Sequence, residues 1–148
     1  MKCVIQRVSS SKVTVDNKVV GSIGVGLNIL LGVQKGDTKD DIGKLVNKII
    51  NLRIFKDENE KMNLSLLDID GEALVISQFT LAGNIKKGRR PSFDSSEKPE
   101  TAKELYEEFV KEISNAGIKT QTGEFGAMMH VEIHNDGPVT FIVDSEEL

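Results

Sequence analysis

The sequence has a single cysteine, no long apolar run and no excess of positive charge, and each shortage excludes a class of protein. One cysteine, Cys3, rules out an internal disulfide and a zinc site built on cysteines. No apolar stretch is long enough to span a membrane. Gln6, Arg7 and Ser9–Ser11 interrupt the N-terminal segment, which therefore lacks the apolar core of a signal peptide. We expect a soluble, cytoplasmic protein.

The charge balance limits how the chain could meet nucleic acid. Its formal net charge of −4 argues against a protein that coats nucleic acid through bulk positive charge. A local basic cluster is still compatible with that balance, and one is present at Lys86, Lys87, Arg89 and Arg90. This cluster is either a solvated loop or a contact for phosphate groups, and the sequence favours neither interpretation.

The chain of 148 residues suits one domain, residues 1–148, which is large enough to fold without disulfide or metal cross-links. The first third predicts β-structure, in short valine-rich segments broken by Ser9–Ser11, by glycines and by a hairpin turn at Asp16–Asn17. Residues 27–33 are almost entirely apolar and predict a central strand. Residues 53–60 predict a hairpin or edge element.

Two segments have the apolar spacing of amphipathic helices. The first begins after Asp37 or Thr38, either of which can cap it. The second begins near Pro99 with Ser95 or Ser96 as its cap and ends at Gly117. The predicted buried positions are Ile42, Leu45, Val46, Ile49 and Ile50 in the first, and Ala102, Leu105, Tyr106, Phe109, Val110 and Ile113 in the second.

The remaining segments complete an α+β pattern with a mixed sheet. Residues 73–76 predict a fully buried strand. Residues 82–98 predict a long polar loop, of the kind that often forms a lid or a binding loop. Two closing strands are predicted over about 128–133 and 139–143, on either side of a turn at Gly137-Pro138.

Two segments carry the strongest functional signal. Ser77–Leu81 places polar side chains directly after a buried strand, where buried polar groups need partners. In a continued strand, Gln78 and Thr80 share one face and Phe79 lies on the other. Gly137-Pro138 offers bare, rigid backbone, because glycine has no Cβ and proline fixes its own φ and permits a cis bond. Together the segments predict a pocket that reads a small substrate by shape.

Two other patterns have simpler explanations. His130, Glu132 and His134 share one strand face and could bind a metal, but a solvated strand face is far more common, and we expect the latter. Gly24-Val25-Gly26 is too short for a phosphate-binding loop and has no helix start after it, so it predicts a turn between strands.

The sequence resembles the bacterial-type D-aminoacyl-tRNA deacylases, also called the D-Tyr-tRNA deacylase family, along its whole length. The Ser77–Thr80 and Asn135–Thr140 segments match the two signatures of that family, Ser-Gln-Phe-Thr and Asn-x-Gly-Pro-x-Thr. Further matching segments are residues 1–8, 24–26, 52–55 and 123–129.

The resemblance implies a homodimer with a strongly curved sheet, two main helices and active sites at the subunit interface. Ser77, Gln78, Phe79 and Thr80 would form the catalytic segment of one subunit. Gly137 and Pro138, joined by a cis bond, would enter the site of the other subunit, and Arg7 would hold that dipeptide. The plain interpretation of Arg7 is a surface arginine on a strand, and that of Gly137-Pro138 is a tight turn.

The resemblance also suggests how the remaining residues act. Phe125 and Met129 would line the adenosine end of the pocket, although such residues more often belong to a core. Catalysis would depend on the 2′-hydroxyl of the terminal adenosine of the tRNA, with no cofactor and no metal. Thr80 would only position the substrate, because no base near it in the sequence could activate a nucleophile.

The implied function is hydrolysis of the ester of D-aminoacyl-tRNA, and of glycyl-tRNA, which releases the amino acid and the tRNA. Backbone groups would exclude L-amino acids. Two alternatives remain open from the sequence: a dimer that binds the end of an RNA without catalysis, and an esterase that acts on small esters through a threonine nucleophile.

Overall fold

The computed structural model describes residues 1–148 as eight strands and two α-helices, with two short 3₁₀ turns. The strands are β1 (Lys2–Val15), β2 (Lys18–Ile23), β3 (Gly26–Gly32), β4 (Phe55–Lys56), β5 (Met62–Leu64), β6 (Glu72–Ser77), β7 (Lys119–Thr122) and β8 (His130–Asp144). The helices are α1 (Lys39–Asn51) and α2 (Pro99–Asn115), and the 3₁₀ turns are η1 (Phe79–Ala82) and η2 (Ser145–Glu147).

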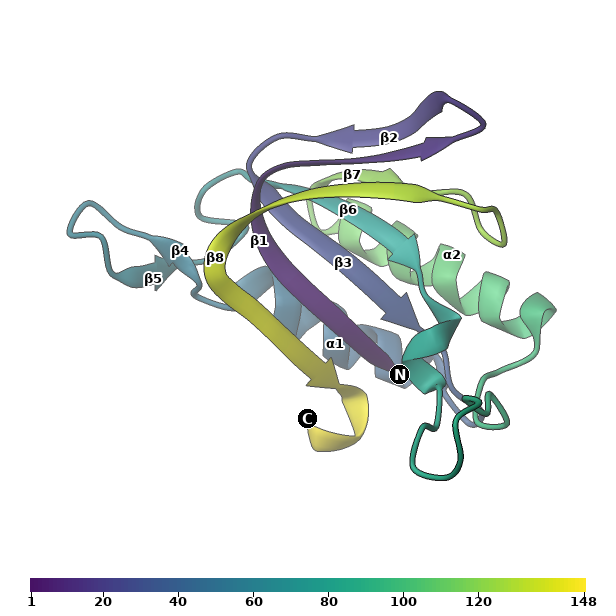
Figure 1. Ribbon diagram of the computed structural model, residues 1–148. Coiled ribbons are helices and arrows are strands. Elements are labelled where there is room, and N and C mark those ends of the chain that lie inside the picture. The colour runs from purple at the N-terminus through teal and green to yellow at the C-terminus, as the bar shows by residue number, and fades with distance from the viewer.

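One mixed sheet forms the body of the molecule. Its strand order is β2-β1-β3-β6-β7, and β8 pairs with β1 off this path. β1 pairs antiparallel with β2, β3 and β8, whereas β3–β6 and β6–β7 are parallel pairs that need crossover connections. The connections contain α1 and α2, which lie side by side behind the sheet (Figure 1). The separate β4–β5 hairpin extends to one side (Figure 1).

The two helices cover one face of the sheet and bury the main core there. All five apolar positions predicted for α1 are buried, and so are those predicted for α2 except Val110, which is half-buried. The α1 N-cap is Thr38, which forms a capping box with Asp41. No helix is both long and apolar enough to cross a membrane.

The sheet curves strongly, so that its opposite face partly closes on itself. In Figure 1, β1 and β8 bend together and carry β2 across towards β7. A Cβ atom on Gly21 of β2 would lie 2.2 Å from the carbonyl oxygen of Thr122 in β7, which shows how closely these two strands approach. A second, smaller core fills the curve, with Val8, Val13 and Leu74 among its members. The predicted α+β class with a mixed, curved sheet and two main helices is confirmed.

Four local predictions need correction. β1 continues through Ser9–Ser11 as one strand, because Ser11 is buried and its hydroxyl bonds Asn28 and the Glu132 carbonyl. β8 is likewise one strand rather than two. β7 (Lys119–Thr122) was not predicted, since its four residues have no apolar alternation. The α2 N-cap is Lys98; Ser95 and Ser96 instead donate to the carbonyls of Ala82 and Phe79.

Candidate active site

The Ser77–Thr80 segment leaves the sheet immediately after its buried strand. β6 ends at Ser77, and the N–H of Gln78 makes the last bond of the ladder, to the carbonyl of Leu31 at 2.8 Å. The chain then turns into η1, whose first closing bond runs from the N–H of Leu81 to the carbonyl of Gln78. The segment thus follows the end of the buried strand, and the alternating faces that a continued strand would give Gln78, Phe79 and Thr80 do not apply. The turn brings Phe79 and Thr80 to the surface instead.

The polar groups of this segment bond one another rather than a catalytic base. Gln78 Nε2 donates to Thr80 Oγ1 at 2.6 Å. Phe79 is exposed, and its ring meets Phe93 edge to face with centroids 5.1 Å apart. The two histidines lie elsewhere, on β8, where His130 and His134 pair with Thr14 and Ser10 of β1. The one hydrogen-bond partner of the Thr80 hydroxyl within the chain is the Gln78 amide, which is not a base.

Gly137-Pro138 lies in a bulge of β8, where pairing with β1 is interrupted. Thr140 pairs with Gln6 and Asn135 pairs with Val8, so four residues of β8, Asp136–Val139, stand opposite the single residue Arg7. The side-chain amide of Asn135 closes this bulge by donating to the carbonyls of Arg7 at 3.0 Å and Val139 at 3.1 Å. The Gly137-Pro138 bond is cis, as the resemblance implied.

Arg7 supports the bulge from within the protein. Its side chain is only 4% exposed, so the interpretation as a surface arginine was wrong. Nη1 donates to the carbonyl of Ile54 at 2.6 Å, and Nε lies 2.9 Å from a carboxylate oxygen of Asp136. The Nε–H bond does not point along that line, so the second contact is an ion pair and not a hydrogen bond. Arg7 therefore fixes the residue directly before Gly137.

One chain does not bring the two signature segments together. Arg7, beside the bulge, pairs with Leu27 of β3, and Leu27 pairs with Ala73 of β6. Ala73 precedes Ser77 by four residues. The bulge is also three strands away from β6, through β1 and β3. At about 3.3 Å per residue and about 4.8 Å per strand, the segments lie roughly 20 Å apart in the sheet.

Phe125 and Met129 lie nearer to the Ser77–Thr80 segment than the bulge does. They follow β7, whose last residue pairs with Val75 of β6. Phe125 is half-buried against Tyr106, with ring centroids 5.7 Å apart, and Met129 packs on the smaller core. Both residues are thus partly core and partly surface, which leaves the predicted contact with adenosine a prediction.

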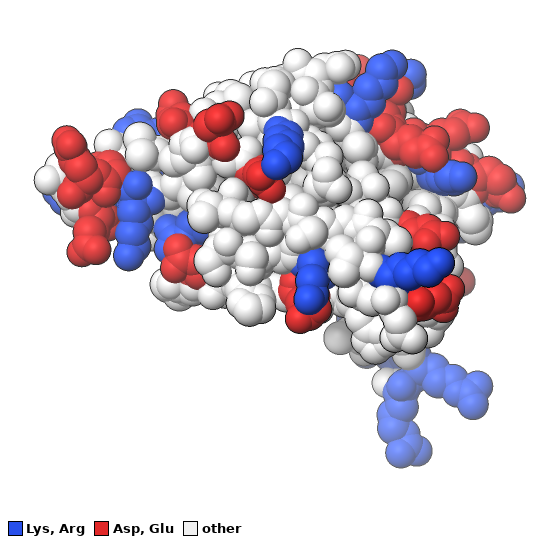
Figure 2. Space-filling view, turned by 90° about the horizontal axis from the view of Figure 1, so that it is seen from above, with Lys and Arg blue, Asp and Glu red and all other residues white.

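The basic cluster lies on a projecting loop between η1 and α2. Lys86, Lys87, Arg89 and Arg90 are all exposed, and none of them forms an ion pair within the chain. Two backbone hydrogen bonds between Asn84 and Ser92 hold the two ends of the loop together. It extends below the sheet in Figure 1, and Figure 2 shows basic side chains that project clear of the body.

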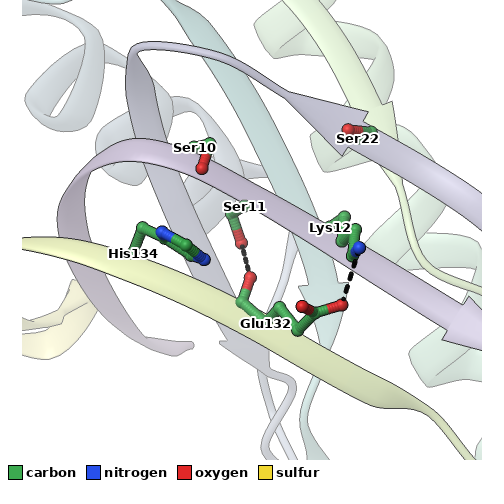
Figure 3. Close-up of a pocket in the computed structure, with 6 residues that line it drawn as sticks. All are labelled: Ser10, Ser11, Lys12, Ser22, Glu132 and His134. Atoms are coloured by element: carbon green, nitrogen blue, oxygen red, sulfur yellow. Dashed lines mark hydrogen bonds and ion pairs between the residues drawn. The ribbon is translucent and has the colours of Figure 1, made fainter.

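The β8 face with His130, Glu132 and His134 is exposed, as expected for a solvated strand face. Glu132 pairs with Lys12 of β1 at 3.0 Å. Figure 3 shows His134 and Glu132 beside Ser10, Ser11, Lys12 and Ser22 around a hollow of about 400 Å³ on the outer side of the sheet. None of the residues predicted for the active site lines this hollow.

Asn135 and Asp136 belong to the second signature segment, and each has a structural role that the sequence did not reveal. In the structure, the Asn135 amide closes the bulge and Asp136 is the partner of Arg7. The available signal was the conjunction of an asparagine and an aspartate beside Gly-Pro, which is typical of a turn held by its own side chains.

The chain is similar to known proteins along its whole length. The model of the family described as D-Tyr-tRNA(Tyr) deacylase matches residues 4–144. The D-aminoacyl-tRNA deacylases of Persephonella marina (strain DSM 14350 / EX-H1) and Aquifex aeolicus (strain VF5) are 68% and 64% identical to this chain over 148 residues, which is 100% of each protein. That of Clostridium botulinum (strain Alaska E43 / Type E3) is 60% identical over 99% of both chains.

Two solved structures share the fold. One, described as c-Myc DNA Unwinding Element Binding Protein, is 38% identical with a TM-score of 0.92, over 97% of this chain and 98% of its own. The other, described as a probable eukaryotic D-amino acid tRNA deacylase, has a TM-score of 0.80 over 96% of this chain and 97% of its own, at 18% identity. The match to the family model and these full-length similarities establish that the chain belongs to the D-Tyr-tRNA(Tyr) deacylase family.

Proposed function

We propose that this protein works as a homodimer in which each active site joins the Ser77–Thr80 segment of one subunit to Gly137-Pro138 of the other. Its activity is that of its family, hydrolysis of the ester bond of D-aminoacyl-tRNA. The observation that carries the proposal is the strand register, which puts three strands and four residues, roughly 20 Å measured along the sheet, between the two segments on one chain. Two copies related by a two-fold axis would form two equivalent sites.

A partly exposed apolar strip supports the dimer. Val4, Leu30 and Ile142 are neighbours across β1, β3 and β8, on the face that the helices leave open. Ile142 is 72% exposed. Across β3 the strip ends at Ile76 of β6, which is fully buried in the smaller core, and exposed Phe79 lies three residues further along the chain. Exposed apolar side chains such as Ile142 and Phe79 often meet a partner, and a second copy would cover them beside the catalytic segment.

The fold of a single chain does not explain why position 137 is a glycine. A Cβ atom there would meet only the Asn135 side chain, at an ordinary 3.5 Å. The fold itself therefore leaves room for a larger residue. A glycine would be needed if another molecule, the substrate or the partner subunit, approached its backbone closely.

This arrangement would select the amino acid by exclusion. Backbone at Gly137-Pro138 cannot rotate away as a side chain can, so it would block the direction in which an L-side chain projects. A D-amino acid or glycine would fit without a dedicated contact to its side chain. Pocket fit alone discriminates by only about 1–3 kcal/mol per methylene group, which makes a rigid obstacle the stronger device.

Catalysis in this proposal depends on the tRNA and on backbone groups. The 2′-hydroxyl of the terminal adenosine would assist attack on the ester, with no metal or cofactor. Phe79 and Thr80 are the first two residues of η1. The first N–H groups of a helix have no partner within it, so the N–H groups of Phe79 and Thr80 would be free to face the ester carbonyl. Ser77 and Gln78 would hold this turn, and Phe125 and Met129 would contact the adenosine. A protein acting on charged tRNA would work in the cytoplasm.

A panel of substrates tests the function. The protein is incubated with D- and L-aminoacyl-tRNA of the same amino acid, with glycyl-tRNA and with a free D-amino-acid ester. We expect hydrolysis of the D-aminoacyl and glycyl forms at more than about 200 times the rate for the L-form, beyond what one methylene contact gives. Binding without hydrolysis would favour an RNA-end binding dimer. Equal hydrolysis of the free ester would favour a threonine-nucleophile esterase.

The second prediction concerns Thr80. Thr80→Ala should retain kcat within about tenfold, the scale of one lost hydrogen bond, because the hydroxyl meets only Gln78. Replacing the terminal 2′-hydroxyl of the tRNA by hydrogen should lower kcat by at least about 100-fold, as for loss of a general acid–base group. Thr80→Ser is the matched control. Detection by mass spectrometry of an acyl group on Thr80 would contradict this mechanism.

The third prediction concerns the basic cluster, which we propose contacts tRNA phosphates. Changing Lys86, Lys87, Arg89 and Arg90 to Gln should weaken tRNA binding without changing the preference for D-amino acids. The slope of log affinity against log salt should flatten by about 0.7–0.9 for each lost contact. The control removes the same charge at exposed Lys44, Lys48, Lys56 and Lys61. An unchanged slope in the first variant would assign the cluster to solvent.

A further inference from the structure

The two N–H groups proposed to face the ester belong to peptide units whose carbonyls point away from it. In a trans peptide, the C=O of one residue and the N–H of the next lie in one plane and point in opposite directions. Both peptide units here are trans. The N–H of Phe79 is therefore aimed by whatever holds the Gln78 carbonyl, and the N–H of Thr80 by whatever holds the Phe79 carbonyl.

The Gln78 carbonyl is held within the turn itself. The N–H of Leu81 donates to it at 3.2 Å, as the first closing bond of η1. Bonds of this three-residue spacing have poorer geometry than those of an α-helix, which is why such turns stay short. A turn of only four residues needs support from outside if it is to hold two N–H groups in fixed directions.

Ser96, at the far end of the long loop, supplies such support. Its hydroxyl donates to the Phe79 carbonyl at 3.2 Å. This bond reaches the peptide between Phe79 and Thr80 from the side opposite the Thr80 N–H. It restrains the plane of that peptide. It also polarises the peptide, which makes the N–H on the other side a stronger donor.

Ser96 is anchored to the continuation of β3. The N–H of Lys35 donates to the carbonyl of Ser95 at 2.9 Å, and the N–H of Glu97 donates to the carbonyl of Val33 at 3.2 Å. These two backbone bonds lie on either side of Ser96. The serine hydroxyl therefore approaches η1 from a segment that is tied to the sheet.

Other contacts hold η1 in place without reaching the peptide between Phe79 and Thr80. The Ser95 hydroxyl donates to the carbonyl of Ala82, the last residue of the turn, at 2.6 Å. The turn also rests on the backbone of β3, because a Cβ on Gly32 would lie 2.9 Å from the Leu81 Cβ. Ser95 is thus a neighbour of the same chemistry that has no link to the two N–H groups.

We propose that Ser96 is a positioning residue whose hydroxyl orients the peptide between Phe79 and Thr80 and so aims the Thr80 N–H at the ester carbonyl; this inference rests on the proposed function. The hydroxyl acts through the Phe79 carbonyl and does not touch the substrate. At 3.2 Å the bond is long for a hydroxyl donor, and it shortens when negative charge develops on the ester oxygen, because hydrogen bonds in a chain polarise one another. Ser96 therefore contributes to kcat and not to substrate binding.

Three variants test the proposal on D-aminoacyl-tRNA. Ser96→Ala should lower kcat by about 3- to 13-fold, the scale of one hydrogen bond, and change KM by less than about twofold. Ser96→Thr keeps the hydroxyl and should restore the wild-type kcat. Ser95→Ala is the matched control: it removes the shorter bond and should lower Tm at least as much as Ser96→Ala does, with kcat unaltered. A wild-type kcat in Ser96→Ala, or an equal loss in Ser95→Ala, would overturn the proposal.

Two analogues give a readout that a merely structural role would not move. Both carry the skeleton of the same D-amino acid on the 3′ position of adenosine. One is a 3′-amide, which resembles the substrate, and the other is a phosphonate, whose tetrahedral anionic group resembles the intermediate. Ser96→Ala should weaken binding of the phosphonate by the factor by which it lowers kcat/KM, and leave binding of the amide unchanged. Equal weakening of both analogues would assign Ser96 to substrate binding and overturn the proposal.

The outcomes also separate this inference from the proposed function. If the wild-type protein hydrolyses D-aminoacyl-tRNA and Ser96→Ala does so equally fast, the inference about Ser96 fails and the deacylase function stands. If the wild-type protein hydrolyses no D-aminoacyl-tRNA, the proposed function fails, and the inference that rests on it fails too.

Discussion

The irregular pairing of β1 with β8 at Arg7 is the constraint on which the proposed site depends. Two long antiparallel strands would normally pair without interruption, but here one residue of β1 stands opposite four of β8. A buried guanidinium must be paired, and Arg7 finds the Ile54 carbonyl and the Asp136 carboxylate. The Asn135 amide closes the two ends of the bulge. Gly137-Pro138 is thus presented at a defined place by its neighbours Asn135 and Asp136.

The same strand pairing determines what one chain lacks. β1 is the strand that connects β8 to the rest of the sheet, so the bulge lies on one side of β1 and the end of β6 lies two strands away on the other. The helices occupy one face, and on the other face Val4 and Leu30 are only half-buried and Ile142 is exposed. A polar turn that follows a buried strand, a rigid bulge remote from it and an apolar strip between them are the parts of a site that a second copy would complete.

Much of the fold could be predicted from the sequence, because helix stripes, caps and fully apolar strands are local patterns. The positions of α1, β3 and β6 follow from such patterns. The errors occurred where tertiary contacts overrode local preference. β7 is a short polar strand that pairs along the edge of β6, and β1 passes through three serines because one of them, Ser11, bonds Asn28 in the interior. The burial of Arg7 depends on a carbonyl 47 residues away in sequence, which no local pattern reveals.

In the candidate site too, local sequence patterns were predictable and tertiary arrangements were not. The two signature segments could be recognised from the residues, but the turn after Ser77 and the distance between the segments required the structure.

The central claim is that each site draws on two chains, and a mixed dimer tests it most directly. One subunit carries Gly137→Phe and the other carries Phe79→Pro, which removes an N–H at the start of η1. Each variant must be inactive as a homodimer, and tags belong at exposed Leu148 because the amine of Met1 is buried.

The purified mixed dimer then gives opposite results under the two possible arrangements. If the sites are shared, one of its two sites combines an intact Ser77–Thr80 segment with an intact Gly137-Pro138 and the other combines both defects. Our account therefore predicts about half the wild-type rate of D-aminoacyl-tRNA hydrolysis per dimer. If each site lay within one chain, both sites would carry a defect. A mixed dimer as inactive as the two parent variants would contradict the account.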